Sequence, residues 1–225
     1  MSEQNRRSRI IDFYQAHPIM VALTYLPFYL LGFFLIEQLV EPKYILHCSL
    51  DDWIPFCEYF IVPYVFWFVE LVLVPLLLLR YDVGQYYYLC FVMFVGMTCC
   101  LLLYVLLPNG LELRVEITRH NLCAELVRLM QQMDTPTNVC PSIHVASSLA
   151  MDLAICRSVL GQKRRVRIAS HGVFVLIVLS TVFLKQHSVI DVFWGAVLTL
   201  ALHGIWTWII NPKEKVCSRQ QRGDF

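Results

Sequence analysis

The sequence predicts an all-α fold, an integral membrane six-helix bundle, and two observations carry that prediction. First, 58% of its 225 residues are hydrophobic and only 16% are charged, whereas soluble domains average about 45–50% apolar and about 25% charged residues. Second, the apolar residues gather into six segments, each close to the ~20 residues that cross a ~30 Å hydrocarbon core. Backbone at membrane depth must form its hydrogen bonds internally, so such segments are expected to be helices. They leave no room for a soluble domain, and residues 1–225 are predicted to form one membrane domain.

In chain order, the expected spans are 19–40, 56–79, 85–107, 141–160, 168–184 and 190–210. Asp152 and His171 interrupt the apolar runs of the fourth and fifth spans. The segment 108–140 is expected to be an external loop with a short amphipathic helix, whose apolar residues recur at helical spacing. They are Leu122, Leu126, Leu129, Met130 and Met133. This helix either lies in the plane of the membrane interface or packs on the bundle.

The distribution of basic residues predicts the orientation in the membrane. Most of the 18 Lys and Arg residues fall in the two termini and in alternate loops. The opposite side has only Lys43, Arg114, Arg119, Arg128 and Lys185. The positive-inside rule therefore predicts a multi-pass cell-membrane protein with both termini in the cytoplasm. The net charge of +1 and the lack of a basic-aromatic stripe predict no nucleic-acid partner. The expected partners are the bilayer and a membrane lipid, and no pattern indicates an oligomeric state.

Three polar clusters fall on the predicted extracytoplasmic face, so an active site is expected there. They are Leu113–Glu116, Cys140–His144 and Lys185–Asp191. His187 and Asp191 are four residues apart and would share one face of a helix. A carboxylate bonded to one imidazole nitrogen leaves the other free as a nucleophile or base. A structural polar pair is an alternative interpretation, and so is a metal site formed by His144, His187 and Asp191.

The second cluster favours anion binding at a helix N-terminus. Pro141 suits the first helical position, and the amide groups that follow it would point towards a bound anion. Ser142 would add a hydroxyl group, and His144 would add a titratable group one step deeper. Two histidines from different helices around such a site suit phosphoryl transfer, in which one attacks phosphorus and the other protonates the leaving oxygen.

These residues resemble the signatures of the type 2 phosphatidic acid phosphatase superfamily. Pro141-Ser142-Ile143-His144 is similar to its P-S-x-H motif, and Ser180, His187 and Asp191 fit its S-R-x5-H-x3-D motif. The resemblance covers about half of the chain, from the third span to the sixth. It implies that His187 forms a phosphohistidine, Asp191 orients it and His144 is the general acid. It further implies that Ser142 and Ser180 belong to the phosphate site, and that no metal or cofactor takes part.

The departures from these signatures remove two cations. In the first signature, K-x6-R-P, Arg114 matches the arginine, but Leu107 and Val115 replace the lysine and the proline. In the third, Thr181 replaces the arginine. Lys185 is expected to supply one of the missing charges. A lipid phosphodiester demands less neutralisation than a phosphomonoester, and the pattern is similar to the branch that contains inositol phosphorylceramide synthase and sphingomyelin synthase.

The leading hypothesis is a lipid phosphatase that hydrolyses a lipid phosphate ester through a phosphohistidine. The first alternative is a phosphotransferase that moves a phospholipid head group to a lipid alcohol. The second is a small transporter that uses the intramembrane residues Glu70, Asp152 and His203, since polar groups inside a membrane are functional candidates. Polar contacts between helices explain these three residues equally well.

Overall fold

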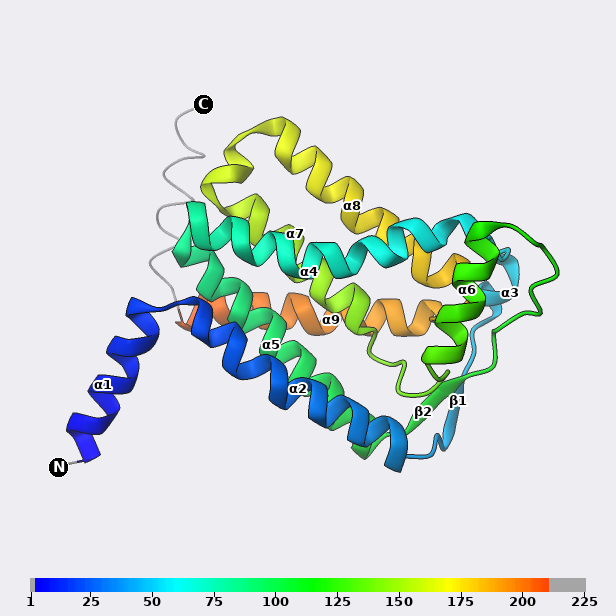
Figure 1. The fold of residues 1–225 in the computed structure, drawn as a ribbon, viewed down its shortest axis with the longest axis horizontal. Helices are drawn as coiled ribbons and strands as arrows, with labels where there is room; N and C mark the ends of the chain where they lie inside the picture. The colour runs from blue at the N-terminus through cyan, green and yellow to red at the C-terminus, as the bar shows by residue number, and fades with distance from the viewer. Residues whose placement is uncertain (1–2, 211–225) are drawn as a thin grey trace.

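The computed structural model describes residues 3–210, which are mostly helical. Figure 1 shows long helices packed along one another, with α1 (Glu3–Ala16) projecting from one end. Five of the described stretches are long and apolar enough to cross a membrane. They are α2 (Ile19–Leu39), a 3₁₀ turn (Glu58–Phe60) with α4 (Ile61–Tyr81), α5 (Val83–Leu106), α8 (Arg164–Phe183), and α9 (Val189–Ile205) running into a π-helical turn (Trp206–Ile210). The helical class is confirmed, and five predicted spans coincide with these stretches to within a few residues.

The segment predicted as the fourth span, 141–160, forms a shorter helix than expected. Helix α7 covers Ile143–Arg157, 15 residues, or about 22 Å at 1.5 Å per residue. It is not among the five candidate spans. Ser158 ends the helix, and a 3₁₀ turn (Val159–Gln162) follows. Most of α7 is buried, and it contacts α4, α5, α8 and α9. Its many Ala and Ser residues allow this close packing, so α7 lies at the centre of the structure.

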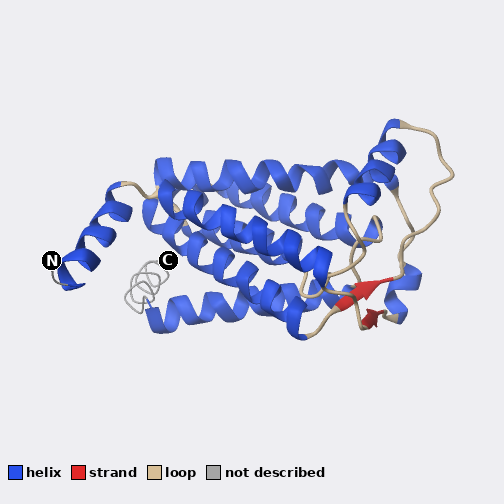
Figure 2. Ribbon diagram, turned by 60° about the horizontal axis from the view of Figure 1, so that its bottom comes forward, coloured by secondary structure: helices blue, strands red, loops and turns tan. Residues whose placement is uncertain are grey.

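The loop segments at one end of the helices pack together as a cap. Strand β1 (Tyr44–Leu46) pairs in parallel with β2 (Asn109–Leu111), and α3 (Ser49–Trp53) and α6 (Leu122–Met133) lie beside them (Figure 2). The amphipathic helix predicted within 108–140 is α6. Asn121 caps it by accepting a hydrogen bond from the Ala124 amide at 2.9 Å. Since α6 contacts α4 and buries Val127 against Tyr64, it packs on the helices of the core.

A close approach between α7 and α9 fixes the geometry at this end of the molecule. A Cβ atom on Gly195 would lie 2.7 Å from the Ser142 carbonyl oxygen and 3.2 Å from the Val145 Cβ. Only glycine therefore lets the two helices meet here. The Ser142 amide also donates to the Asp191 carbonyl at 3.1 Å. The N-terminal ends of α7 and α9, which carry two of the predicted polar clusters, are thereby held side by side.

Candidate active site

His144, His187 and Asp191 lie together, as the sequence predicts. His187 Nε2 is 3.4 Å from His144 Nδ1, and His187 Nδ1 is 3.3 Å from Asp191 Oδ2. Asp191 is fully buried, and its Oδ2 also accepts a hydrogen bond from the Ser188 amide at 2.9 Å. An ionised carboxylate only accepts, so the proton of His187 belongs on Nδ1. Nε2 is then unprotonated and lies 3.4 Å from His144 Nδ1, and an unprotonated ring nitrogen is what an imidazole nucleophile uses.

The polypeptide around His187 is held at both ends. Helix α8 ends in a turn at which Lys185 adopts a left-handed conformation (φ 58°), and the amides of Gln186 and His187 both donate to the Thr181 carbonyl. Helix α9 begins directly after it with a capping box between Ser188 and Asp191. The Asp191 carboxylate therefore also takes part in the capping box at the start of its own helix.

The side chain of Lys185, which was expected to supply a phosphate-binding charge, is buried, and its Nζ donates to the Asp51 carbonyl oxygen. Asp51, on α3, is a residue that the sequence analysis missed. Its carboxylate accepts from the Ser188 hydroxyl at 2.6 Å and from the Val189 amide at 2.9 Å. An acidic residue in a loop after the first span carries no signal of such a distant contact. Asp51 thus fastens α3 to the turn that carries His187.

Two of the predicted phosphate ligands have structural partners. Ser142 is fully buried, and its Oγ caps α7 by accepting from the Val145 amide at 3.4 Å. The Ser180 hydroxyl donates to the Ile177 carbonyl at 2.6 Å inside α8. Arg114 is the predicted cation that does reach the site. It donates to the Gln186 side chain at 3.0 Å and lies 3.7 Å from Asp134 Oδ2.

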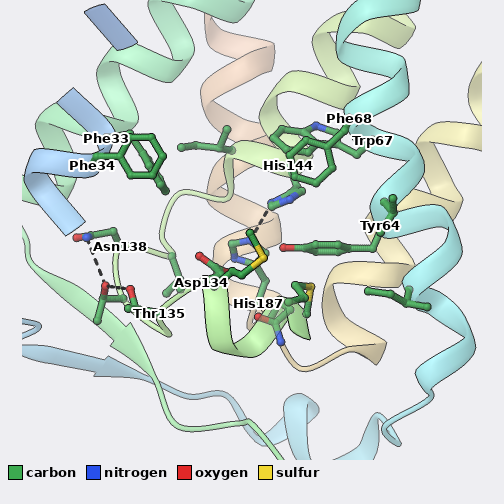
Figure 3. A pocket seen from close by; sticks show the side chains of 18 of the residues that line it. Phe33, Phe34, Tyr64, Trp67, Phe68, Asp134, Thr135, Asn138, His144 and His187 are labelled. Atoms are coloured by element: carbon green, nitrogen blue, oxygen red, sulfur yellow. Dashed lines mark hydrogen bonds between the residues drawn. The ribbon is translucent and has the colours of Figure 1, made fainter. Parts of the chain in front are cut away.

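A cavity of about 460 Å³ opens beside the two histidines (Figure 3). Its walls come from α2, α4 and α6 and from residues 134–139, and they are mainly apolar and aromatic. Asp134 is the one carboxylate among the described lining residues, and no Lys or Arg lines the cavity. Asp134 is the C-cap residue of α6, and the sequence predicts no functional role for it. Its position beside His187 follows from the packing of α6, which the sequence does not specify.

His144 sits among aromatic rings at one side of this cavity. Its ring centroid is 4.6 Å from that of Tyr64 and 4.1 Å from that of Trp67. Trp67 is itself fixed by a 2.9 Å hydrogen bond to Ser147. His144 Nε2 is buried without a hydrogen-bond partner in the described structure. Buried polar atoms are nearly always paired, so this nitrogen is available to a group that enters the cavity.

The intramembrane polar residues considered for a transporter all have partners on neighbouring helices. Glu70 accepts from the Ser148 hydroxyl at 3.3 Å, and His203 bonds Tyr88 at 2.8 Å. Asp152 accepts from Ser170 at 2.6 Å and pairs with His171 at 2.7 Å. This is the pattern of polar contacts between packed helices. Within residues 3–210, the one group of side chains suited to hold a metal ion is Asp152, Cys156 and His171, away from the two active-site histidines.

No protein family, curated protein or solved structure matches the chain.

Proposed function

We propose that the chain is a membrane enzyme that hydrolyses a phosphate ester of a lipid through a phosphohistidine, as its resemblance to the type 2 phosphatidic acid phosphatases implies. The alignment Asp191–His187–His144 at the wall of an apolar cavity carries the proposal. His187 Nε2 forms a bond to phosphorus while the bond from phosphorus to the lipid oxygen breaks. His144, protonated at the start of this step, gives its proton to that oxygen and is left neutral. Water, deprotonated by His144, then attacks phosphorus and releases His187.

The burial of the site supports this chemistry. His187 is only 7% exposed, so the Asp191 carboxylate acts on it with little screening by water, and the imidazolium form that develops during reaction is stabilised. Transfer of the phosphoryl group to a lipid alcohol is the second candidate. The apolar wall formed by Leu126, Leu129 and Met130 favours it, since the same surface that binds a lipid substrate would bind a lipid acceptor.

The test is turnover and trapping with the purified chain. Vesicles of defined phospholipids, with and without lipid alcohols, are assayed for released phosphate compounds and for new phospholipids. His187→Ala should abolish turnover, and His144→Ala should reduce it by about 10²–10⁴-fold. His120→Ala, a change at an exposed histidine of the external loop, is the control and should keep full activity. Rapid quenching should trap acid-labile phosphate on the wild type only. Turnover by His187→Ala would refute the mechanism.

The proposal includes a topology in which α7 also crosses the bilayer, which makes a six-helix bundle with the site on the extracytoplasmic side of the cell membrane. Helix α7 is short, but it is shielded from lipid by its neighbours. The basic residues that predict cytoplasmic termini support this orientation; Lys213, Lys215, Arg219 and Arg222 lie outside the described residues. An impermeant thiol reagent added to intact cells should label Cys123, whose loop lies at the active-site end. Labelling only after permeabilisation would contradict the topology.

A further inference from the structure

The charge of the cavity is unusual for a site that acts on a phosphate. A carboxylate, Asp134, lines it beside His187, and no lysine or arginine does so among the described residues. Figure 3 shows Asp134 near both His187 and Tyr64. Arg114 is the nearest cation, and its shortest contacts are to the Gln131 carbonyl at 3.1 Å and to Gln186 at 3.0 Å. The Arg114 guanidinium lies 3.7 Å from Asp134 Oδ2. The positive charge of Arg114 is thus balanced by the negative charge of Asp134, and the pair has no net charge.

From this charge arrangement we infer that the substrate is a phosphodiester lipid with a positively charged head group, and that Asp134 binds that cation. The inference rests on the proposed function and names its substrate class. A phosphomonoester carries nearly two negative charges at neutral pH. In this cavity it would lie beside the Asp134 carboxylate, and the guanidinium group of Arg114 is already paired with that carboxylate. A zwitterionic diester fits better, because its phosphate carries one negative charge and faces the two histidines while its ammonium group pairs with Asp134.

The walls of the cavity agree with an ammonium group and lipid tails. Aromatic faces attract cations electrostatically, and Tyr29, Phe33 and Phe34 of α2 line the side opposite α4. Leu126, Leu129 and Met133 of α6 provide hydrocarbon surface to the cavity, and each of these side chains is exposed. The orphan His144 Nε2 adds a polar partner for the substrate.

The reaction balances without a further reactant besides water. A bond forms between His187 Nε2 and phosphorus, and the ester bond to the lipid alcohol breaks. His144 gives its proton to the departing alkoxide, so a neutral lipid alcohol is released. Water then displaces His187, giving its proton to His144, and the product is a phosphorylated amino alcohol. The ammonium group remains at Asp134 through both steps and keeps the phosphoryl group oriented.

The experiment compares head groups in matched vesicles of phosphatidylcholine, phosphatidylethanolamine, phosphatidylglycerol and phosphatidic acid. The wild type should prefer the zwitterionic diesters. Asp134→Asn should lower the ratio of zwitterionic to phosphatidylglycerol turnover by about tenfold, equivalent to ~1.4 kcal/mol. Glu112→Gln removes an exposed carboxylate of the same loop segment outside the cavity and should leave the ratio unchanged.

A second measurement separates this inference from the proposed function. Binding of short-chain versions of the four lipids to His187→Ala, followed by tryptophan fluorescence, reports head-group preference without chemistry. Selective binding of the zwitterionic lipids with no turnover by the wild type would refute the phosphoesterase and leave the head-group preference standing. Turnover with a ratio that Asp134→Asn does not change would refute the role of Asp134 alone. If the protein shows neither selective binding nor turnover, both the head-group preference and the phosphoesterase are refuted.

Discussion

Replacing Gly195 by alanine tests whether the contact between α7 and α9 sets the distance between the two histidines. The new Cβ would lie 2.7 Å from the Ser142 carbonyl oxygen, where ordinary contacts begin at 3.4 Å. The N-terminus of α7 must therefore move by about 0.7 Å, and overpacking of this kind costs ~1–3 kcal/mol. His144 is two residues after Ser142 and moves with it. A misplacement of ~1 Å can cost ~10²-fold in rate, so we expect turnover to fall by about 10- to 100-fold.

The same helix provides the control. A Cβ on Gly204 would meet nothing within 4 Å, so Gly204→Ala should leave turnover unchanged and gain up to ~1 kcal/mol of stability from helix propensity. Initial rates and thermal unfolding are measured on both variants in the same detergent. A Gly195→Ala protein with wild-type turnover would show that the close approach of α7 and α9 does not control the catalytic geometry.

Three further predictions concern charged residues. Arg114→Ala should lower kcat/KM by ~2.7–4 kcal/mol of barrier, as for the loss of a transition-state donor; full activity would exclude Arg114 from phosphate binding. Asp51→Asn should cost ~0.5–2 kcal/mol of stability through the weakened cap on α9, measured by thermal unfolding, whereas Asp52→Asn at the exposed neighbour should not. Burial raises the pKa of the Asp134 carboxyl, although Arg114 lowers it in part. The preference for zwitterionic lipids should therefore be complete above that raised pKa and weaken as the pH falls through it, earlier than for an ordinary aspartate. The ratio of kcat/KM values for phosphatidylcholine and phosphatidylglycerol measures this, since titration of the shared catalytic groups cancels, and a ratio independent of pH would contradict it. The groups that face Asp134 are Arg114, Glu37, His187 and Tyr64.

The long helices could be predicted because their signal is local. An apolar run of about 20 residues is sufficient evidence for each, and the five candidate spans follow the predicted segments closely. Helix α7 shows the limit of this reasoning. Its sequence contains enough Ala and Ser to pack centrally, but whether Ser158 continues or ends the helix depends on its hydrogen bonds to neighbouring groups.

At the candidate site too, contacts within one helix could be predicted, whereas contacts between distant segments could not. His187 and Asp191 are four residues apart, so their contact follows from helix geometry. The start of α7 was predicted to within two residues, but Ser142 is its N-cap and Pro141 precedes the cap instead of occupying the first helical position. Lys185 was assigned by its position two residues before His187, yet its left-handed backbone turns the side chain towards α3. Asp51 and Asp134 reach the site through contacts between distant segments, and such contacts leave no periodic trace in a single sequence.

The pairing of β1 with β2 has a mechanical consequence. Helix α2, which forms one wall of the cavity, leads within a few residues into β1 and then to α3, where Asp51 holds the turn carrying His187. β2 follows α5, and its central residue, Gly110, also forms a bridge with Thr137, three residues after Asp134. A displacement of α2 would therefore be passed through this strand pair to the turn that carries His187 and to the segment that carries Asp134. Under the proposed function, binding of lipid tails against α2 would then be coupled to the alignment of His187 with Asp191, and a substrate without tails would lack that coupling.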